Sequence, residues 1–258
     1  MSHPRRVFVD FSAGSRPEYG SEVTLSEKDS HHLRVVLRLK EGSALTAVDR
    51  ATAQEYEAII CSLSEPLTVR ILSAKQKRLS VARVTSLIFA LAKGKNTDFV
   101  CEKACELGVR NILLWQSDRS VVRIDSERDR EKKLSRWHSI LESAGKQSGN
   151  DYVPKLTLAL TLNELIATLN SVRVPEDRAF ICSLSPKSKL PSQIAPPVAS
   201  VHIAVGPEGD FTEKEEVALA QQGFESLSLG PLVLRCETAA IVAISMLHGA
   251  WGFLDEKS

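Results

Sequence analysis

The chain has 258 residues and a formal net charge of +1, and its 43% hydrophobic and 25% charged residues are enough for the cores of two ordinary domains. No run of about 18 apolar residues occurs, which excludes a transmembrane helix, and the N-terminal segment lacks the apolar stretch of a signal peptide. Because its five cysteines stand at irregular positions and form no disulfide framework, we expect a cytoplasmic protein in a reducing compartment.

The first part of the chain, to about residue 75, contains short β-type segments separated by Gly and polar turns, a pattern typical of a small barrel. The exception is a helix predicted over Ser26–Leu39, where Ser26 and Asp29 suit an N-terminal cap. The predicted strands are Val7–Asp10, Glu22–Leu25, Ala44–Asp49, Glu55–Ser62 and Thr68–Leu72.

A basic stretch follows. Residues 66–97 hold seven basic side chains and no acidic one, and they include the predicted linker Lys75–Ser80. Residues 1–200 as a whole carry 30 Lys+Arg against 23 Asp+Glu, whereas residues 201–258 carry 3 against 9. This asymmetry favours a polyanionic partner on one face, although a solvated linker with chance charge explains it equally well.

After residue 83 strands and helices alternate, which predicts an α/β domain with a parallel sheet covered on both faces. Thr212 and Glu215 form a capping box, and Gly108 and Gly223 are placed to end helices. Strands are predicted at Val84–Ala92, Asn111–Gln116, Lys155–Leu160, Arg178–Leu184, Val201–Val205 and Ser226–Leu229, and helices at Asn96–Leu107, Asp125–Lys146, Leu162–Leu169, Thr212–Gln222 and Glu237–Trp251.

Several common sites are absent from the sequence. There is no G-x-G-x-x-G after the first α/β strand, no P-loop and no G-x-S-x-G nucleophile elbow. Cys101 and Cys105 stand four apart without a second ligand pair, so we expect buried thiols and no metal.

Two glycine-containing loops of the α/β part stand out, at residues 205–211 and 229–240. Each is predicted between a strand and a helix, and ligands of open α/β sheets bind at the carboxyl ends of strands. Glycine lets the backbone approach a ligand closely, although a single Gly-Pro pair could equally be a tight turn. Two such loops together predict a site.

These loops, GPEGDF (206–211) and LGPLVLRCETAA (229–240), resemble the C-terminal motifs of the RsmE family, the 16S ribosomal RNA uridine-N3 methyltransferases of the SPOUT superfamily. Similar motifs stand upstream in the same order, so that the resemblance covers nearly the whole chain. They are HHLRVVLRLKEG (31–42), KGKNTDFVCEKACELGV (93–109), RSVV (119–122) and QSGNDYVPKL (147–156).

The resemblance implies a PUA-like RNA-binding β-barrel over residues 1–74 and a SPOUT α/β domain with a C-terminal trefoil knot over residues 80–258. It also implies a homodimer that binds S-adenosylmethionine in the knot. The implied reaction is methylation of N3 of a uridine in the decoding region of 16S rRNA, within the small ribosomal subunit.

By the same resemblance, cofactor contacts fall in three loops. The uridine must lose its N3 proton, so we expect Arg235 to stabilise the resulting anion and Glu237 to help remove the proton. Alternatively, Glu237 and Thr238 simply cap the last helix. The residues expected around the cofactor are Leu184, Gly206, Pro207, Glu208, Gly209, Leu229, Gly230, Leu234, Arg235, Glu237 and Thr238.

RNA contacts are expected from both parts of the chain. Lys103 could also neutralise a phosphate, but a surface ion pair with Glu102 is an equal alternative. The expected RNA-binding residues are His31, Arg34, Arg38, Lys93, Lys95, Arg119, Arg123, Gln147, Ser148 and Asn150.

The chain departs from the family pattern at several positions. Asp210 stands where Gly is usual, Leu232 where Arg is frequent, Cys236 where Thr is usual, and residues 146–150 read KQSGN in place of EQSGR. Two alternatives therefore remain: another SPOUT activity, ribose 2′-O methylation, and an RNA-binding protein that has lost catalysis.

Overall fold

The structure is a computed structural model that describes residues 5–11, 17–50, 54–64, 66–75, 84–150, 152–185, 188–195 and 200–251. The chain divides into two compact units, Met1–Ser80 with Glu142–Val153 and Val81–Leu141 with Pro154–Ser258. Most of the predicted linker, from residue 76, and the predicted start of the second domain at residue 80 lie outside the described residues.

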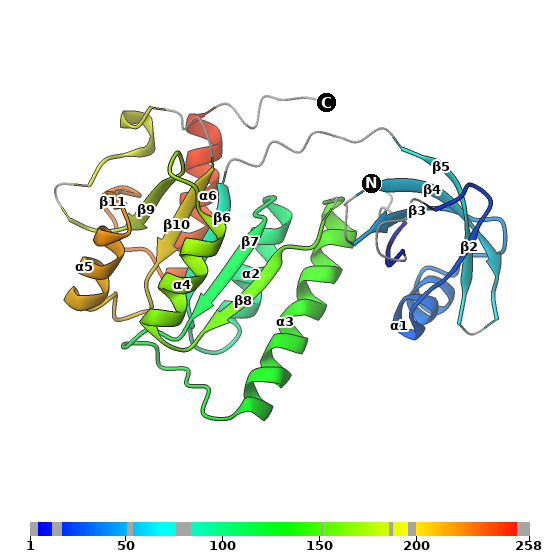
Figure 1. The fold of residues 1–258 in the computed structure, drawn as a ribbon, viewed down its shortest axis with the longest axis horizontal. Coiled ribbons are helices and arrows are strands. Elements are labelled where there is room, and N and C mark those ends of the chain that lie inside the picture. Colours follow the sequence, from blue (N-terminus) through cyan, green and yellow to red (C-terminus); the bar gives the residue numbers. More distant parts are fainter. Residues whose placement is uncertain are drawn as a thin grey trace. The chain divides into compact units, whose positions relative to one another are not determined.

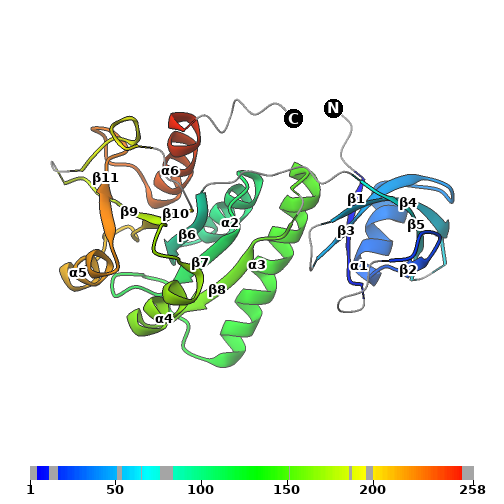
Figure 2. The same cartoon turned by 45° about the horizontal axis from the view of Figure 1, so that its top comes forward.

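The first unit contains a five-stranded mixed sheet in the order β1-β3-β4-β5-β2. β1 pairs with β3 in parallel, and the other neighbours are antiparallel. Two register shifts between β4 and β5 bend the sheet, which curls around α1 as a half-barrel (Figure 2). The strands are β1 (Arg6–Val9), β2 (Glu22–Thr24), β3 (Ala44–Asp49), β4 (Glu55–Ser62) and β5 (Thr68–Ala74).

The helix of this unit differs from the prediction for residues 26–39. Ser26 caps α1 (Glu27–His31), as predicted, but the chain then widens into a π-helical turn over His32–Val36. Leu37 N–H bonds to His32 O at 3.0 Å, and Arg38 takes a left-handed φ of 51°. The π-helical turn and the left-handed residue Arg38 together bring both Leu33 and Leu39 into the core, an arrangement that the predicted regular α-helix over 26–39 does not include.

The end of α3 (Glu127–Ser148) also counts with the first unit. Arg50 Nη1 lies 2.6 Å from Glu142 Oε1, and Lys146 forms an ion pair with the buried Asp29. The domain boundaries predicted from the sequence do not place the end of α3 in the first unit, because the charged sequence of this helix does not indicate which residues it pairs with.

The second unit is built on a six-stranded parallel sheet in the order β11-β9-β10-β6-β7-β8 (Figure 1). Its central strands are mostly apolar, and all five residues of β10 are buried, as expected for a sheet covered on both faces. The predicted α/β class is therefore confirmed. The strands are β6 (Val84–Ala90), β7 (Asn111–Trp115), β8 (Lys155–Ala159), β9 (Arg178–Cys182), β10 (Val201–Val205) and β11 (Phe224–Leu227).

Helices cover both faces of this sheet. α4 and α5 lie on one face of the sheet, where Leu165, Leu169 and Leu219 pack against strand residues in a common core (Figure 1). On the other face α2 contacts both α3 and α6 (Figure 1). The capping box of Thr212 and Glu215 forms as predicted. The helices are α2 (Asn96–Glu106), α3, α4 (Leu162–Val172), α5 (Glu213–Gln221) and α6 (Cys236–Ala250).

The last strand lies two residues earlier than predicted. β11 begins at Phe224, directly after Gly223, because the Phe224 side chain is buried and pairs in register with Ala179. Residues 228 and 229 consequently belong to the following loop. The trefoil knot stays a prediction.

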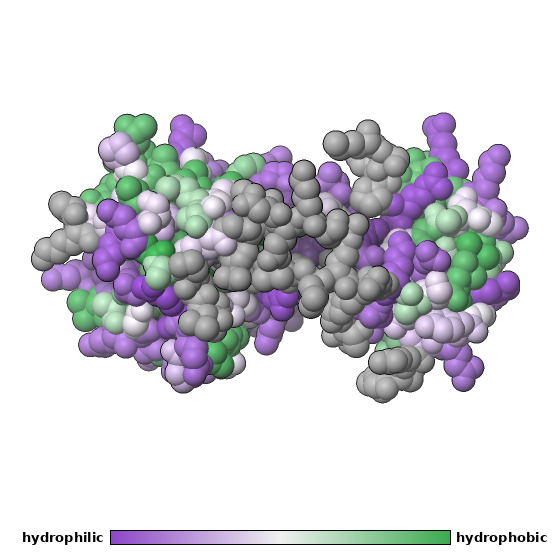
Figure 3. Space-filling view, turned by 90° about the horizontal axis from the view of Figure 1, so that it is seen from above, coloured by the Kyte–Doolittle hydropathy of each residue, from purple (hydrophilic) through white to green (hydrophobic). Residues whose placement is uncertain are grey.

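The surface mixes hydrophobic and hydrophilic side chains on the face seen in Figure 3. In the second unit Leu184, Leu232 and Val233 are 59%, 73% and 80% exposed. Within the described ranges, no helix combines the length and apolar character that crossing a membrane requires.

Candidate cofactor and active site

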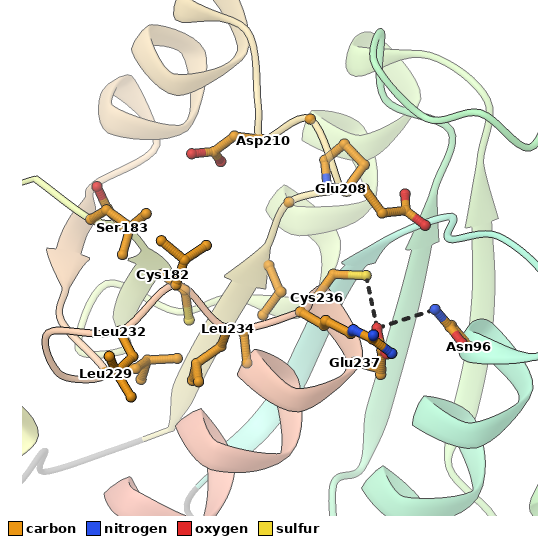
Figure 4. A pocket seen from close by; sticks show the side chains of 18 of the residues that line it. Asn96, Cys182, Ser183, Glu208, Asp210, Leu229, Leu232, Leu234, Cys236 and Glu237 are labelled. Carbon is orange, nitrogen blue, oxygen red and sulfur yellow. Dashed lines mark hydrogen bonds between the residues drawn. The ribbon is translucent and has the colours of Figure 1, made fainter.

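A cavity of about 750 Å³ opens at the carboxyl ends of the strands in the second unit (Figure 4). Four segments form it: the loop after β6, the loop after β9, the loop after β10 and the loop between β11 and α6. These are the loops that a parallel sheet gathers at one edge, which is where α/β proteins bind ligands.

The cavity collects the residues that the sequence predicts around the cofactor, with Thr238 as the exception. Thr238 is exposed on the first turn of α6. Lys93, which was predicted to bind RNA, also lines the cavity. The predicted cofactor residues that line it are Leu184, Gly206, Pro207, Glu208, Gly209, Leu229, Gly230, Leu234, Arg235 and Glu237.

Sequence reasoning missed part of the lining. Cys182 ends β9 and Ser183 directly follows it at the same edge of the sheet, so the rule that ligands bind at strand ends could have identified both. Asn96 gave no signal, because its role depends on how α2 packs beside α6. The other lining residues outside the prediction are Val205, Asp210, Leu232, Val233, Cys236 and Ala239.

The loop after β10 is shaped by a tight turn. Asp210 N–H bonds to Pro207 O at 2.9 Å, and the Asp210 carboxylate accepts from Phe211 N–H at 2.8 Å. A Cβ on Gly206 would lie 2.9 Å from Asp210 Oδ1 and 3.2 Å from Phe211 N, so a larger residue there would disturb the hydrogen bond between these two groups. Asp210 itself adopts φ 60°, a left-handed conformation that Asp tolerates better than most residues.

Arg235 and Glu237 stand where α6 begins. Glu237 Oε2 accepts from Asn96 Nδ2 at 3.1 Å and from Cys236 Sγ at 3.4 Å (Figure 4). The exposed Arg235 is the N-cap of α6, and its guanidinium has no hydrogen-bond or ion-pair partner in the described part of the chain. The site thus combines a carboxylate held at one oxygen with a guanidinium available to a ligand.

Two thiols form part of the cavity wall. Burial raises the pKa of Cys182 to about 12, with a further contribution from Asp210. Burial and the hydrogen bond to Glu237 raise the pKa of Cys236 to about 12 as well. Both side chains are therefore neutral at physiological pH and are unsuited to nucleophilic chemistry.

The RNA-binding candidates of the second unit fall into two groups. Lys93 and Lys95 are exposed. Arg119 donates to the carbonyl oxygens of Gly209 and Phe211, and Arg123 donates to those of Ser117 and Asp118. Lys103 is paired with Glu102 and Glu106, at 2.7 and 2.8 Å.

The remaining RNA-binding candidates belong to the first unit. His31 and Arg38 are exposed, and Arg34 is half-buried. At the end of α3, Gln147 is exposed, whereas the Ser148 hydroxyl donates to Ala144 O at 2.8 Å. Asn150 follows directly, half-buried.

Known proteins share this architecture. A family model for the RNA methyltransferase domain matches residues 77–248, about two-thirds of the chain. Ribosomal RNA small subunit methyltransferase E of Bacillus subtilis (strain 168) is 24% identical over 247 residues, which cover 94% of this chain and 95% of the relative. The enzyme of that name from Mycobacterium bovis is 27% identical, over 97% of this chain and 94% of the relative.

The chain belongs to the RsmE family of RNA methyltransferases. Solved structures agree over nearly the whole length. Ribosomal RNA small subunit methyltransferase E from Neisseria gonorrhoeae, bound to S-adenosyl methionine, matches with TM-score 0.83 and 28% identity, covering 96% of this chain and 98% of that one. A Legionella pneumophila methyltransferase with bound SAM matches with TM-score 0.84, 30% identity and the same coverage.

The cavity of this RsmE-family chain suits S-adenosylmethionine in size and chemistry. Its volume is typical of small-molecule sites. Leu184, Leu229 and Leu234 offer apolar surface to an adenine ring, and the N–H groups of Val233 and Leu234 make no hydrogen bond within the described residues. The lining also includes carboxylates that complement a cationic ligand.

Proposed function

We propose that this protein uses S-adenosylmethionine to methylate N3 of a uridine in the decoding region of 16S rRNA. The observation that carries the proposal is that one cavity joins the glycine loops to Arg235 and Glu237. The names of the relatives support an rRNA substrate, and the bound ligand of the Neisseria and Legionella structures supports the cofactor.

Bound S-adenosylmethionine would supply an electrophilic methyl group. The backbone of residues 206–209 and 229–234 would hold this cofactor, with Leu184, Leu229 and Leu234 against its adenine. Because most of these contacts come from backbone and apolar groups, the departures at Asp210, Leu232 and Cys236 leave cofactor binding largely intact.

The uridine must be activated by removal of its N3 proton. Asn96 and Cys236 both bond to Oε2 of Glu237, so Oε1 is available to accept that proton, directly or through one water. Arg235 would stabilise the charge that spreads to the uracil carbonyl oxygens. The two residues thus divide proton removal and charge stabilisation between them.

The first unit would bind RNA through His31, Arg34 and Arg38 together with Gln147, Ser148 and Asn150, which the structure includes in the same compact unit. Lys93 and Lys95 would neutralise phosphates near the cavity.

We further propose a homodimer that acts in the cytoplasm, where ribosomal subunits lie. Leu232 and Val233 support it, because they are 73% and 80% exposed at the rim of the cavity, and water-exposed apolar side chains favour an interface. Sedimentation should therefore detect a dimer.

The test of the reaction is methyl transfer from labelled S-adenosylmethionine into small subunits from cells that lack the enzyme, followed by nucleoside analysis. We expect N3-methyluridine as the product. Ribose-methylated nucleoside would show the sister SPOUT activity. Tight RNA binding without transfer would show a protein that has lost catalysis.

A further inference from the structure

Arg119 connects the loop after β7 with the loop after β10, although β7 and β10 are not adjacent in the sheet. It follows β7, and its Nη1 donates to Gly209 O at 2.9 Å and to Phe211 O at 3.1 Å in the loop after β10. β6 lies between β10 and β7 in the sheet, so the Arg119 side chain spans the end of a whole strand. Its aliphatic part also passes close to Gly209, where an added Cβ would lie 3.5 Å from Arg119 Cδ.

Two further contacts connect the end of β7 and the loop after it with the loop after β10 and the start of α5. The rings of Trp115 and Phe211 stack with centroids 5.2 Å apart. Asp118 N–H donates to Glu215 Oε1 at 2.7 Å, and Glu215, only 1% exposed, closes the capping box with Thr212 through its other oxygen. Arg119 is therefore part of a brace between these loops.

The segment after β7 is itself well fixed. Arg123 donates to Asp118 O at 2.6 Å, the hydroxyls of Ser117 and Ser120 are 2.9 Å apart, and Ile124 N–H bonds to the Gln116 side chain at 2.6 Å. A fixed segment can hold a neighbouring loop in one conformation, and the loop after β10 needs such support because Asp210 is left-handed.

We propose that Arg119 is a positioning residue for the cofactor, which holds residues 206–211 in the binding conformation through the carbonyls of Gly209 and Phe211. This inference rests on the proposed function, which makes S-adenosylmethionine the ligand of that loop. It gives Arg119 a role different from the phosphate contact that the sequence suggests, because its hydrogen bonds are directed to the cavity loop.

Calorimetric titration of S-adenosylmethionine into the full-length protein tests the inference. Arg119→Ala should raise the Kd about tenfold or more, because two charge-assisted hydrogen bonds are lost. Arg119→Lys, which can still donate to a carbonyl, should recover part of that loss. The matched control is Arg128→Ala, since Arg128 is an exposed arginine of the same unit without a partner in the described residues.

Two measurements, turnover at saturating S-adenosylmethionine and the salt dependence of RNA binding, distinguish a positioning role of Arg119 from a direct contact with RNA. At saturating S-adenosylmethionine, Arg119→Ala should return to within about twofold of normal turnover, since only ground-state cofactor binding is weakened. The salt dependence of RNA binding should not change. An unaltered cofactor Kd with a salt slope reduced by about 0.9 would overturn the inference and make Arg119 a phosphate ligand.

The wild-type titration keeps the two proposals apart. If the wild type binds S-adenosylmethionine and Arg119→Ala binds it with the same Kd, the inference is overturned and the proposed function is not. Absence of binding by the wild type overturns the proposed function, and the inference with it.

Discussion

The carboxyl and amino ends of the strands form two opposite edges of the parallel sheet in the second unit, and these two edges differ in chemistry. At the carboxyl edge, where β6, β9, β10 and β11 end, the chain leaves a cavity, an exposed guanidinium and apolar side chains at the surface. At the amino edge, where β9, β10 and β11 begin, a buried carboxylate is hydrogen-bonded to a buried imidazole and to backbone N–H groups.

The amino edge is centred on Asp177 and His202, whose side chains are 2% and 0% exposed and whose Oδ2 and Nε2 lie 3.0 Å apart. Asp177 also accepts from Val174 N–H at 2.9 Å and from Ser200 N–H at 3.0 Å. Arg173 donates to Gln222 O just before β11.

This difference has a physical cause. A buried carboxylate whose hydrogen bonds all come from protein groups, as at Asp177, stabilises the fold, whereas a guanidinium without protein partners is available to a ligand. Mutations at the two edges should consequently separate stability from activity.

The largest effect is expected at the carboxyl edge. Arg235→Ala should lower turnover by about 100-fold or more, because the anion formed on uracil loses its stabilising charge. RNA affinity and the free energy of unfolding should change little, since Arg235 is exposed and its guanidinium bonds to no described residue. Methyl-transfer kinetics beside RNA binding measure this, and normal turnover in the variant would refute the role of Arg235.

The amino edge should give the largest loss of stability. Asp177→Ala leaves the N–H groups of Val174 and Ser200 and the His202 ring without their acceptor, which should cost about 2–4 kcal/mol of unfolding free energy. Chemical denaturation measures it, with Asp177→Asn as the milder control. Cofactor affinity should stay unchanged below the unfolding transition, and a weakened affinity would contradict the separation of the edges.

The same edge should make stability depend on pH. Burial lowers the pKa of His202 despite its hydrogen bond to Asp177, so the neutral ring donates from Nε2, and its buried Nδ1 has no partner among the described residues. Burial acts to raise the pKa of Asp177, but hydrogen bonds from Val174, His202 and Ser200 outweigh it and hold this pKa below its usual value.

The sign follows from these directions. Below about pH 6.5 the His202 side chain is protonated in the unfolded state but stays neutral in the folded state. As the pH falls through this range, His202 should therefore lower the unfolding free energy by up to about 1.4 kcal/mol per pH unit. His248, whose pKa burial also lowers, should add a similar term. Asp177 contributes only at lower pH, where its carboxylate becomes protonated. Denaturation of His202→Gln between pH 5 and 7.5 should show a smaller slope, and an identical slope would exclude His202 as the source.

The smallest effect concerns the left-handed turn of the cavity loop. Asp210→Gly should change the unfolding free energy by less than about 1 kcal/mol, because relief of the backbone strain offsets the lost hydrogen bond to Phe211 N–H. Asp210→Ala loses that bond and keeps the strain, so it should be less stable than the Gly variant by about 1 kcal/mol. Equal melting temperatures for the two variants would mean that the φ of Asp210 is not costly.

Local signals explain what the sequence could predict. β3, β4 and the capping box at Thr212 follow from alternation and cap chemistry, and the cavity follows from two glycine loops at strand ends. The π-helical turn at 32–36, the roles of Asn96 and Arg119, and the Asp177–His202 pair depend on partners distant in sequence. Periodicity carries no information about those partners.

The central claim is that the carboxyl edge binds S-adenosylmethionine while the amino edge only stabilises the fold. Hydrogen–deuterium exchange of the full chain, with and without the cofactor, tests it most directly. We expect protection of peptides that cover 182–184, 206–211 and 229–237, and no change at 173–178 and 200–202. Protection confined to the amino edge or to the first unit would contradict the account.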